Sequence, residues 1–173
     1  MKTVVFACNS NSCRSQMAEG WAREWIRVQQ DERGVEIGNT VVASIALDSS
    51  AVFHNNDSHQ ERKSVKCKAV EVMSQDGVDI SSFYPKTLEE ILPLTSYTTQ
   101  DHKPIDVLIV LCSWGDDVKK KLHQQCKSIQ VWNVEAPTAA AKVEGESAYR
   151  RVSLEIRDHV HSLMEELHSE MIK

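Results

Sequence analysis

The 173-residue sequence lacks several features that would assign it to a class at once. No apolar run is long enough to cross a membrane, and the first one, Val4–Ala7, is too short for a signal peptide. Basic residues are not in excess either: the net charge is −5, which gives no long-range attraction to nucleic acid or anionic lipid. Repeats and low-complexity segments are also missing. We therefore expect a cytoplasmic protein that binds neither nucleic acid nor membranes.

Cysteine is scarce, and its number is odd. Five cysteines in a chain without a secretory signal indicate reduced thiols, some of them reactive, and argue against a disulfide framework. The share of hydrophobic residues is 41% and that of charged residues is 26%, both ordinary for a globular protein. The chain is thus long enough and apolar enough to form one domain, 1–173, with a sizeable core.

Strand and helix signals alternate along the chain. Apolar runs predict strands at 3–7, 40–46, 105–111 and 129–132. Apolar residues at helical spacing predict helices at 13–30, 64–75, 87–92, 115–126 and 146–171. This alternation predicts an α/β fold with one four-stranded parallel sheet and helices on both faces. The catalytic loops should gather at the carboxyl ends of the strands.

Three polar stretches are predicted to be loops: 48–63, 95–104 and 135–145. The first contains His54 and His59, which are candidate metal ligands. Solvated loop histidines are far commoner than metal ligands, so we expect no metal site there.

The stretch from Cys8 to Ser15 lies where the first strand passes into the first helix. A loop in that place directs several backbone N–H groups and the positive end of the helix dipole at one point, which favours an anion. The planar fork of Arg14 adds donors that match a tetrahedral oxyanion. The residues expected to bind the oxyanion are Asn9, Ser10, Asn11, Ser12, Cys13 and Arg14.

Cys8 is expected to be a nucleophile at the centre of this loop. The converging donors place positive potential on its sulfur, which favours the thiolate. The Ser15 hydroxyl can donate to that thiolate, and Asn11 tolerates the left-handed conformation that a tight ring needs. A Cys and an Arg after a strand are usually accidental. Here the order of strand, loop and helix favours the functional interpretation.

The same segment carries a family resemblance. Residues 8–21, Cys-Asn-Ser-Asn-Ser-Cys-Arg-Ser-Gln-Met-Ala-Glu-Gly-Trp, resemble the phosphate loop of arsenate reductases that share the low-molecular-weight tyrosine phosphatase fold. The Gln-Met-Ala-Glu-Gly run is more similar to the reductases than to the phosphatases. The similarity covers most of the chain except for insertions near 54–63 and 95–104, and it continues through 44–50, 77–81, 110–112 and 132–137.

The resemblance implies a route for the reduction of arsenate, of which phosphate and sulfate are mimics. The Cys8 thiolate would attack arsenate, held by Arg14 and the loop backbone. Cys112, at the end of the central strand and on the same sheet edge, matches the family's resolving cysteine and would then attack the Cys8 sulfur. The alternative for Cys112 is a small buried core thiol. Electrons would come from glutathione with glutaredoxin, or from thioredoxin, with no bound cofactor.

The other cysteines have weaker assignments. Cys126 is a candidate second redox cysteine, but it follows Cys112 by 14 residues and lies on a predicted apolar helix stripe, which favours core packing. Cys67 is interpreted as structural. Cys13 matches a position whose cysteine, in the phosphatase branch, protects the nucleophile by forming a disulfide with it. Cys13 could protect Cys8 in the same way.

The chain departs from the family pattern after the fourth strand. Ala136-Pro137 stands where relatives usually have Asp-Pro, so the usual proton donor is missing, and Glu135 is a candidate substitute. General acid catalysis is worth ~10²–10⁴-fold, and arsenate can arrive already protonated on the leaving oxygen. The departure therefore weakens the alternative function of a tyrosine phosphatase more than that of a reductase. A third alternative, a catalytically weak oxyanion-binding or redox-sensing module, also stays open.

Overall fold

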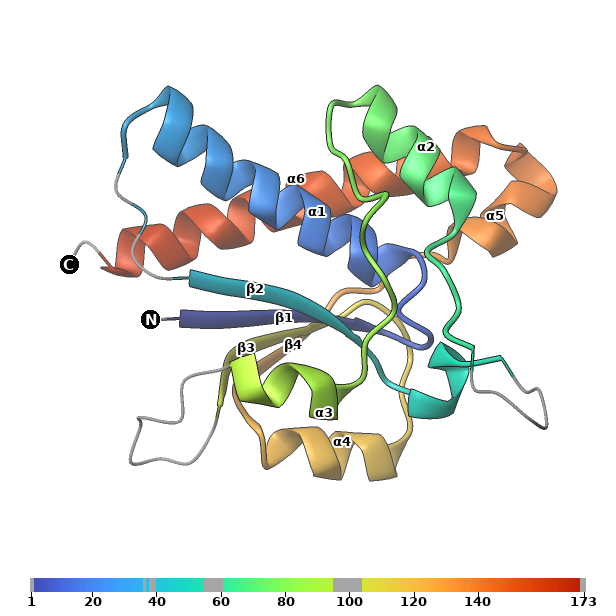
Figure 1. Ribbon diagram of the computed structural model, residues 1–173, viewed down its shortest axis with the longest axis horizontal. Coiled ribbons are helices and arrows are strands. Elements are labelled where there is room, and N and C mark those ends of the chain that lie inside the picture. Colours follow the sequence, from blue (N-terminus) through green and yellow to red (C-terminus); the bar gives the residue numbers. More distant parts are fainter. Residues whose placement is uncertain (1, 36, 38–39, 55–60, 95–103, 172–173) are drawn as a thin grey trace.

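The computed structural model describes residues 2–35, 37, 40–54, 61–94 and 104–171 (Figure 1). Within these residues, four strands form one sheet in the order β2-β1-β3-β4, and every neighbouring pair is parallel. The strands are β1 (Lys2–Cys8), β2 (Thr40–Ala46), β3 (Ile105–Val110) and β4 (Cys126–Val131). The predicted α/β fold with a four-stranded parallel sheet is confirmed.

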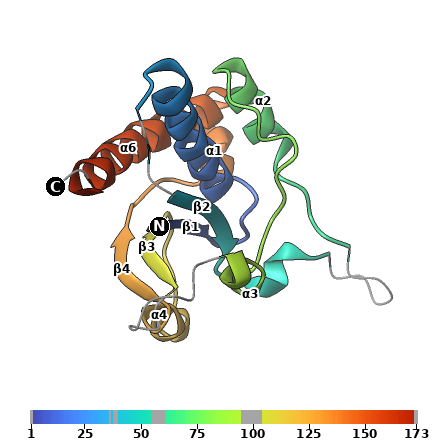
Figure 2. The same ribbon diagram turned by 60° about the vertical axis from the view of Figure 1, so that its left-hand side comes forward.

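Helices cover both faces of this sheet, as Figures 1 and 2 show. On one face lie α1, α2 and α6, and on the other lie α3 and α4. A capping box between Thr87 and Glu90 begins α3, in the helix predicted at 87–92. The helices are α1 (Arg14–Arg27, continued by a π-helical turn over Val28–Glu32), α2 (Cys67–Gln75), α3 (Leu88–Ile91), α4 (Asp116–His123), α5 (Pro137–Glu144) and α6 (Ser147–Met171).

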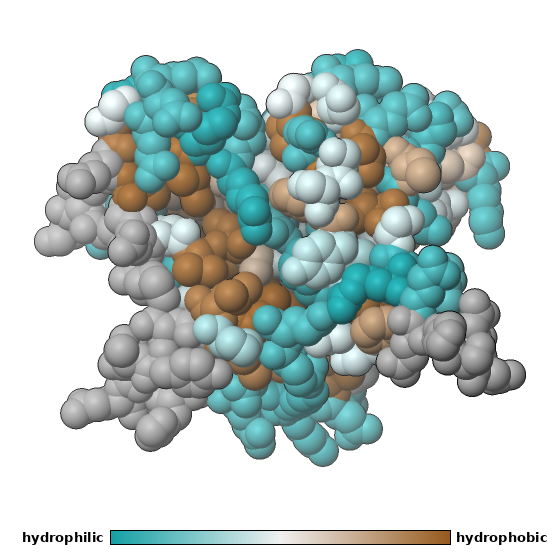
Figure 3. Space-filling view, viewed as in Figure 1, coloured by the Kyte–Doolittle hydropathy of each residue, from teal (hydrophilic) through white to brown (hydrophobic). Residues whose placement is uncertain are grey.

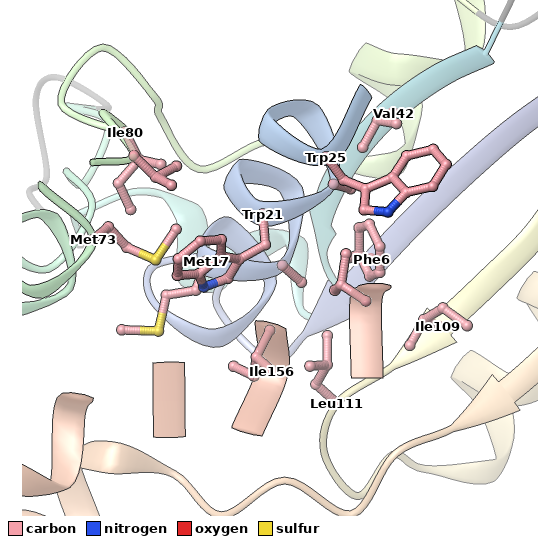
Figure 4. Packing of buried hydrophobic residues seen from close by; sticks show 14 of the residues in the cluster. Phe6, Met17, Trp21, Trp25, Val42, Met73, Ile80, Ile109, Leu111 and Ile156 are labelled. Atoms are coloured by element: carbon pink, nitrogen blue, oxygen red, sulfur yellow. The ribbon is translucent and has the colours of Figure 1, made fainter. Parts of the chain in front are cut away.

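The two cores follow from the alternation of side chains along the central strand β1. Val4 and Phe6 point to one face and join the larger cluster, while Val5 and Ala7 point to the other. Figure 4 shows Phe6 in the larger cluster together with residues of α1 and α6, among them Trp21, Trp25 and Ile156. Because every residue of β1 from Thr3 to Cys8 is buried, the loop that follows it starts from a rigid position.

The surface of the molecule on the side seen in Figure 3 is mostly polar. Figure 3 shows hydrophobic residues gathered in the band between α1 and α3, where Figure 1 places β2, with hydrophilic residues around them. In the described part of the chain, no helix combines the length and the apolar character needed to span a membrane.

Two predictions about local structure were wrong. The helix expected at 115–126 ends at His123, and Cys126 is the first residue of β4. The loop expected at 135–145 contains α5, which begins at Pro137. Proline fits the first turn of a helix because its missing N–H has no partner there anyway, and the alanines that follow favour a helix.

The predicted loops at 48–63 and 95–104 lie only partly within the described residues. A short 3-10 turn spans Ser49–Val52, and Phe53 forms an isolated bridge with Arg62. Residues 55–60, which include His59, and 95–103 fall outside the described residues.

Candidate active site

The loop between β1 and α1 encloses a cavity of about 350 Å³ at the carboxyl edge of the sheet. Asn11 adopts a left-handed backbone with φ of 50°, as expected for a tight ring. The chain then enters α1 at Arg14. The cavity is lined by Cys8, Asn9, Ser10, Ser12, Cys13, Arg14, Lys66, Ala136, Pro137 and Thr138.

The sulfur of Cys8 lies at the base of the loop with a fixed hydroxyl beside it. Only 4% of Cys8 is exposed, and its Sγ is 2.9 Å from Oγ of Ser15. The side-chain amide of Asn11 donates to the same Oγ at 2.8 Å. Because that contact occupies an acceptor site of the hydroxyl, the hydroxyl hydrogen is directed at the sulfur. The predicted neighbourhood of Cys8 and Ser15 is present, and Asn11 orients it.

Arg14 is anchored by the ends of two neighbouring segments. Its Nη1 donates to the carbonyl of Leu111 at 2.8 Å and to that of Val134 at 2.7 Å. Among the residues that the structure describes, its Nε and Nη2 have no hydrogen-bond or ion-pair partner. The guanidinium is thus held in place by one nitrogen and retains donors for an oxyanion.

A layer of buried polar groups holds Asn11 in turn. Its Oδ1 accepts from the Gln16 side chain at 2.9 Å and from the backbone N–H of Lys86 at 2.7 Å. The same Gln16 nitrogen donates to the carbonyl of Tyr84 at 2.8 Å. These contacts tie the loop to residues 84–86, so the loop geometry is set before any ligand binds.

Glu19 lies behind that layer and is almost fully buried, with 1% exposed. Its carboxylate forms ion pairs with Arg23 and with Lys86, the latter at 3.1 Å, and it accepts from the Ser44 hydroxyl. A buried charge is tolerated only when it is paired and hydrogen-bonded. Sequence reasoning missed both Gln16 and Glu19 as supports of the loop. The available signal was two polar residues on a helix whose neighbours face the core.

Cys112 lies beside the loop, as its position after the central strand predicted. The backbone N–H of Leu111 donates to the carbonyl of Ala7 at 2.8 Å, which continues the β1–β3 pairing as far as the two cysteines. Burial and the neighbouring Cys8 raise the pKa of Cys112, and Arg14 acts in the opposite direction. Cys112 is half-buried and adjacent to the nucleophile.

Three further cysteines have different environments. Cys13 lines the cavity but is buried; that burial, together with the nearby Cys8, raises its pKa to about 12 and keeps it a neutral thiol. Cys67 is exposed at the start of α2. Cys126 is buried and pairs with Ile105, seven residues before Cys112. At about 3.3 Å per residue along a strand, Cys126 lies roughly 20 Å from Cys112, because it is at the amino end of the strands and Cys112 follows their carboxyl end.

The place of the usual proton donor in the cavity is occupied by Ala136, and Glu135 does not line the cavity. Ala136 lines the cavity at the start of α5, whereas Glu135 is exposed and pairs with Arg151 at 2.9 Å. Lys66 and Thr138 line the cavity instead, and sequence reasoning named neither. Both come from segments far from the loop in sequence, so no local pattern marks them.

No group of three or more His, Cys, Asp or Glu residues suited to a metal ion occurs within the described ranges.

Comparison with known proteins supports the resemblance seen in the sequence. The model of the family described as "Low molecular weight phosphotyrosine protein phosphatase" matches residues 3–173. An arsenate reductase from Staphylococcus xylosus is 32% identical over 158 residues, which cover 90% of this chain and 91% of that protein. A glutaredoxin arsenate reductase from Synechocystis sp. is 29% identical over 166 residues, covering 95% and 97%.

A solved structure of an arsenate reductase in the oxidized state is similar throughout. Its TM-score is 0.64 at 25% identity, and the match covers 96% of this chain and 98% of that one. The resemblance to arsenate reductases with this fold is confirmed.

Proposed function

The chain belongs to the low molecular weight phosphotyrosine protein phosphatase family, and from that premise we propose that it is an enzyme that reduces arsenate to arsenite. Residues 1–173 would act as one catalytic domain. The observation that most strongly supports this proposal is the position of Cys112 next to Cys8, across the β1–β3 pairing. A phosphatase needs one thiol, whereas a reductase needs a second within reach.

In the first step, the Cys8 thiolate attacks arsenate in line. Backbone N–H groups of residues 9–14 and the free donors of Arg14 hold the equatorial oxygens. A sulfur–arsenic bond forms while an arsenic–oxygen bond breaks, and the oxygen leaves as water. Ser15 keeps its hydroxyl on the sulfur until the attack. Arsenic remains pentavalent in this step.

In the second step, the Cys112 thiolate attacks the sulfur of Cys8. A sulfur–sulfur bond forms, the sulfur–arsenic bond breaks, and its electron pair stays on arsenic, which leaves as arsenite. The two thiols lose two electrons and become a disulfide, and arsenic gains those two electrons in going from the pentavalent to the trivalent state. The short separation of the two strands makes this step feasible without unfolding of the sheet.

We assign the return of electrons to glutathione with glutaredoxin. Cys126, the candidate second redox cysteine, lies roughly 20 Å from Cys112 at the other end of the strands, by the strand rise of about 3.3 Å per residue, so we assign it no part in a relay. An external thiol can instead attack the disulfide directly from the cavity that Cys8 lines. The relative from Synechocystis that carries glutaredoxin in its name fits this route.

The test is arsenate-dependent oxidation of NADPH in two coupled systems, one with glutathione and glutaredoxin, the other with thioredoxin and its reductase. We expect turnover in the first system and arsenite as the product, and loss of both with Cys8→Ser or Cys112→Ser. Cys126→Ser should turn over like the wild type. Turnover with thioredoxin alone would refute the assigned donor, and no turnover in either system would refute reduction.

A phosphatase remains the second candidate because the family model is that of a phosphotyrosine phosphatase and the oxyanion cavity suits phosphate equally well. Its distinguishing outcome is hydrolysis of aryl phosphates that survives Cys112→Ser. Ala136 argues for poor turnover of any ester without an activated leaving group, since alanine transfers no proton.

A further inference from the structure

The lining of the oxyanion cavity includes a cationic residue that no motif in the sequence marks. Lys66 lines the cavity together with Cys8 and Arg14. Its backbone N–H donates to the carbonyl of Ser12 at 2.8 Å, which fixes the start of α2 against the loop. Its charge acts to lower the pKa of the Cys13 thiol, which lines the same cavity, and its side chain is exposed.

The ammonium of Lys66 is unengaged within the described residues: it has no hydrogen-bond or ion-pair partner there. The two neighbouring lysines differ. The Lys63 ammonium donates to the carbonyl of Ala51 at 2.9 Å, and that of Lys68 pairs with two glutamates. Lys63 and Lys66 both line a neighbouring cavity, but only Lys66 also lines the one that holds Cys8. Lys66 is therefore the lysine of this segment that is available to a bound oxyanion.

The leaving oxygen of an in-line reaction lies opposite the attacking sulfur. Besides the loop itself, the residues that line the cavity with Cys8 are Lys66 and residues 136–138, so the partner of that oxygen is sought among them. Ala136 has no proton to give, and the Thr138 hydroxyl is a weak acid. Glu135 is held outside by Arg151. A lysine ammonium, by contrast, is a stronger acid than the water that the leaving oxygen becomes.

We infer that Lys66 is the catalytic proton donor that replaces the missing carboxylic acid, an inference that rests on the Cys8 chemistry proposed above. As the sulfur–arsenic bond forms and the arsenic–oxygen bond breaks, the ammonium transfers one proton to the departing hydroxide, which leaves as water. Lys66 becomes a neutral amine and regains its proton from solvent. No electron moves in this step, so no reductant is needed.

The experiment isolates this step in protein that carries Cys112→Ser, where the adduct forms and reverts but is not resolved. Each reversal replaces an oxygen of arsenate with one from water. The loss of ¹⁸O from labelled arsenate is followed by mass spectrometry at several arsenate concentrations. The variants added to this parent are Lys66→Met, Lys66→Arg and, as a matched lysine control, Lys63→Met. Cys8→Ser gives the uncatalysed rate, and thermal melts verify folding.

We expect Lys66→Met to lower the maximal exchange rate by about 100-fold or more, the usual range for a lost general acid. Lys66→Arg should keep the wild-type half-saturating arsenate concentration yet stay as slow, because a guanidinium carries the charge but does not release its proton. Lys63→Met should exchange like the parent.

Three results would overturn the inference. Full recovery of the exchange rate in Lys66→Arg would show that charge alone is needed. A change only in the half-saturating arsenate concentration would assign Lys66 to binding. An effect of Lys63→Met equal to that of Lys66→Met would show a nonspecific effect of local charge. Failure of the reductase proposal looks different: exchange occurs in the parent, but the wild type forms no disulfide with arsenate. If the parent shows no exchange, both ideas fall.

Discussion

Ser15→Ala removes the hydroxyl that contacts the proposed nucleophile. Ser15 is fully buried, and its Oγ lies 2.9 Å from Sγ of Cys8. The substitution takes one hydrogen bond from the thiolate and leaves the amide of Asn11 without the acceptor that it contacts at 2.8 Å. We expect slower reaction of Cys8 and a less stable loop.

The magnitude follows from the kind of hydrogen bond that is lost. A hydrogen bond to a charged group contributes about 1.5–3 kcal/mol, which corresponds to a rate change of about 10- to 100-fold. The orphaned Asn11 amide should cost a further ~1–3 kcal/mol of folding free energy, because it stays buried. The same substitution thus changes the reactivity of Cys8 and the free energy of unfolding, and the two are measured separately.

The assay is the rate of Cys8 alkylation by iodoacetamide at neutral pH, read by peptide mass spectrometry, together with urea unfolding. Ser153→Ala is the matched control: Ser153 is also fully buried and bonded at both ends, to Trp21 and Met73, but it does not contact Cys8. We expect Ser153→Ala to lose stability without slowing alkylation. Equal alkylation rates in Ser15→Ala and the wild type would refute the role of the hydroxyl.

Three further predictions concern other parts of the account. Burial and Cys8 raise the pKa of Cys112, so its thiolate stays a minor species at neutral pH. The rate of disulfide formation at saturating arsenate, followed by stopped flow, should therefore rise about tenfold per pH unit from about pH 6 to 8. A rate that does not change with pH would contradict this. In Gly20→Ala the added Cβ would lie 2.6 Å from Ile80, so the free energy of unfolding in urea should fall by about 1 kcal/mol despite the better helix propensity of alanine. A higher free energy of unfolding would contradict this packing. Glu135→Gln should leave arsenate turnover within about twofold, since the exposed pair with Arg151 contributes little, and a large loss would restore Glu135 as the acid.

The sequence predicted the elements whose signals are local. The run at 40–46 became β2 with the same bounds, because a buried parallel strand is nearly continuous in apolar residues. Cys8 and Ser15 were brought together as expected, since strand, tight turn and helix follow one another directly. The position of Cys112 followed from the rule that parallel strands end at one edge.

The failures arose where two patterns overlap or where the contact is not local. Val118, Leu122 and Cys126 share a helical stripe, but the helix ends at His123 and Cys126 begins β4. The strand was predicted only from residue 129, because Lys127 and Ser128 are polar and exposed and give no strand signal. The helix α5 had its own signal in Pro137 and the alanines, which was missed. The contribution of Lys66 depends on the packing of α2 against the loop, which no spacing in the sequence encodes.

The most direct test of the central claim is a disulfide map of the reduced protein after exposure to arsenate, with phosphate as the control anion. We predict one new bond, between Cys8 and Cys112, which forms with arsenate but not with phosphate and is lost in Cys8→Ser. Arsenate that binds without forming this bond, or a bond that uses Cys126 in place of Cys112, would contradict it.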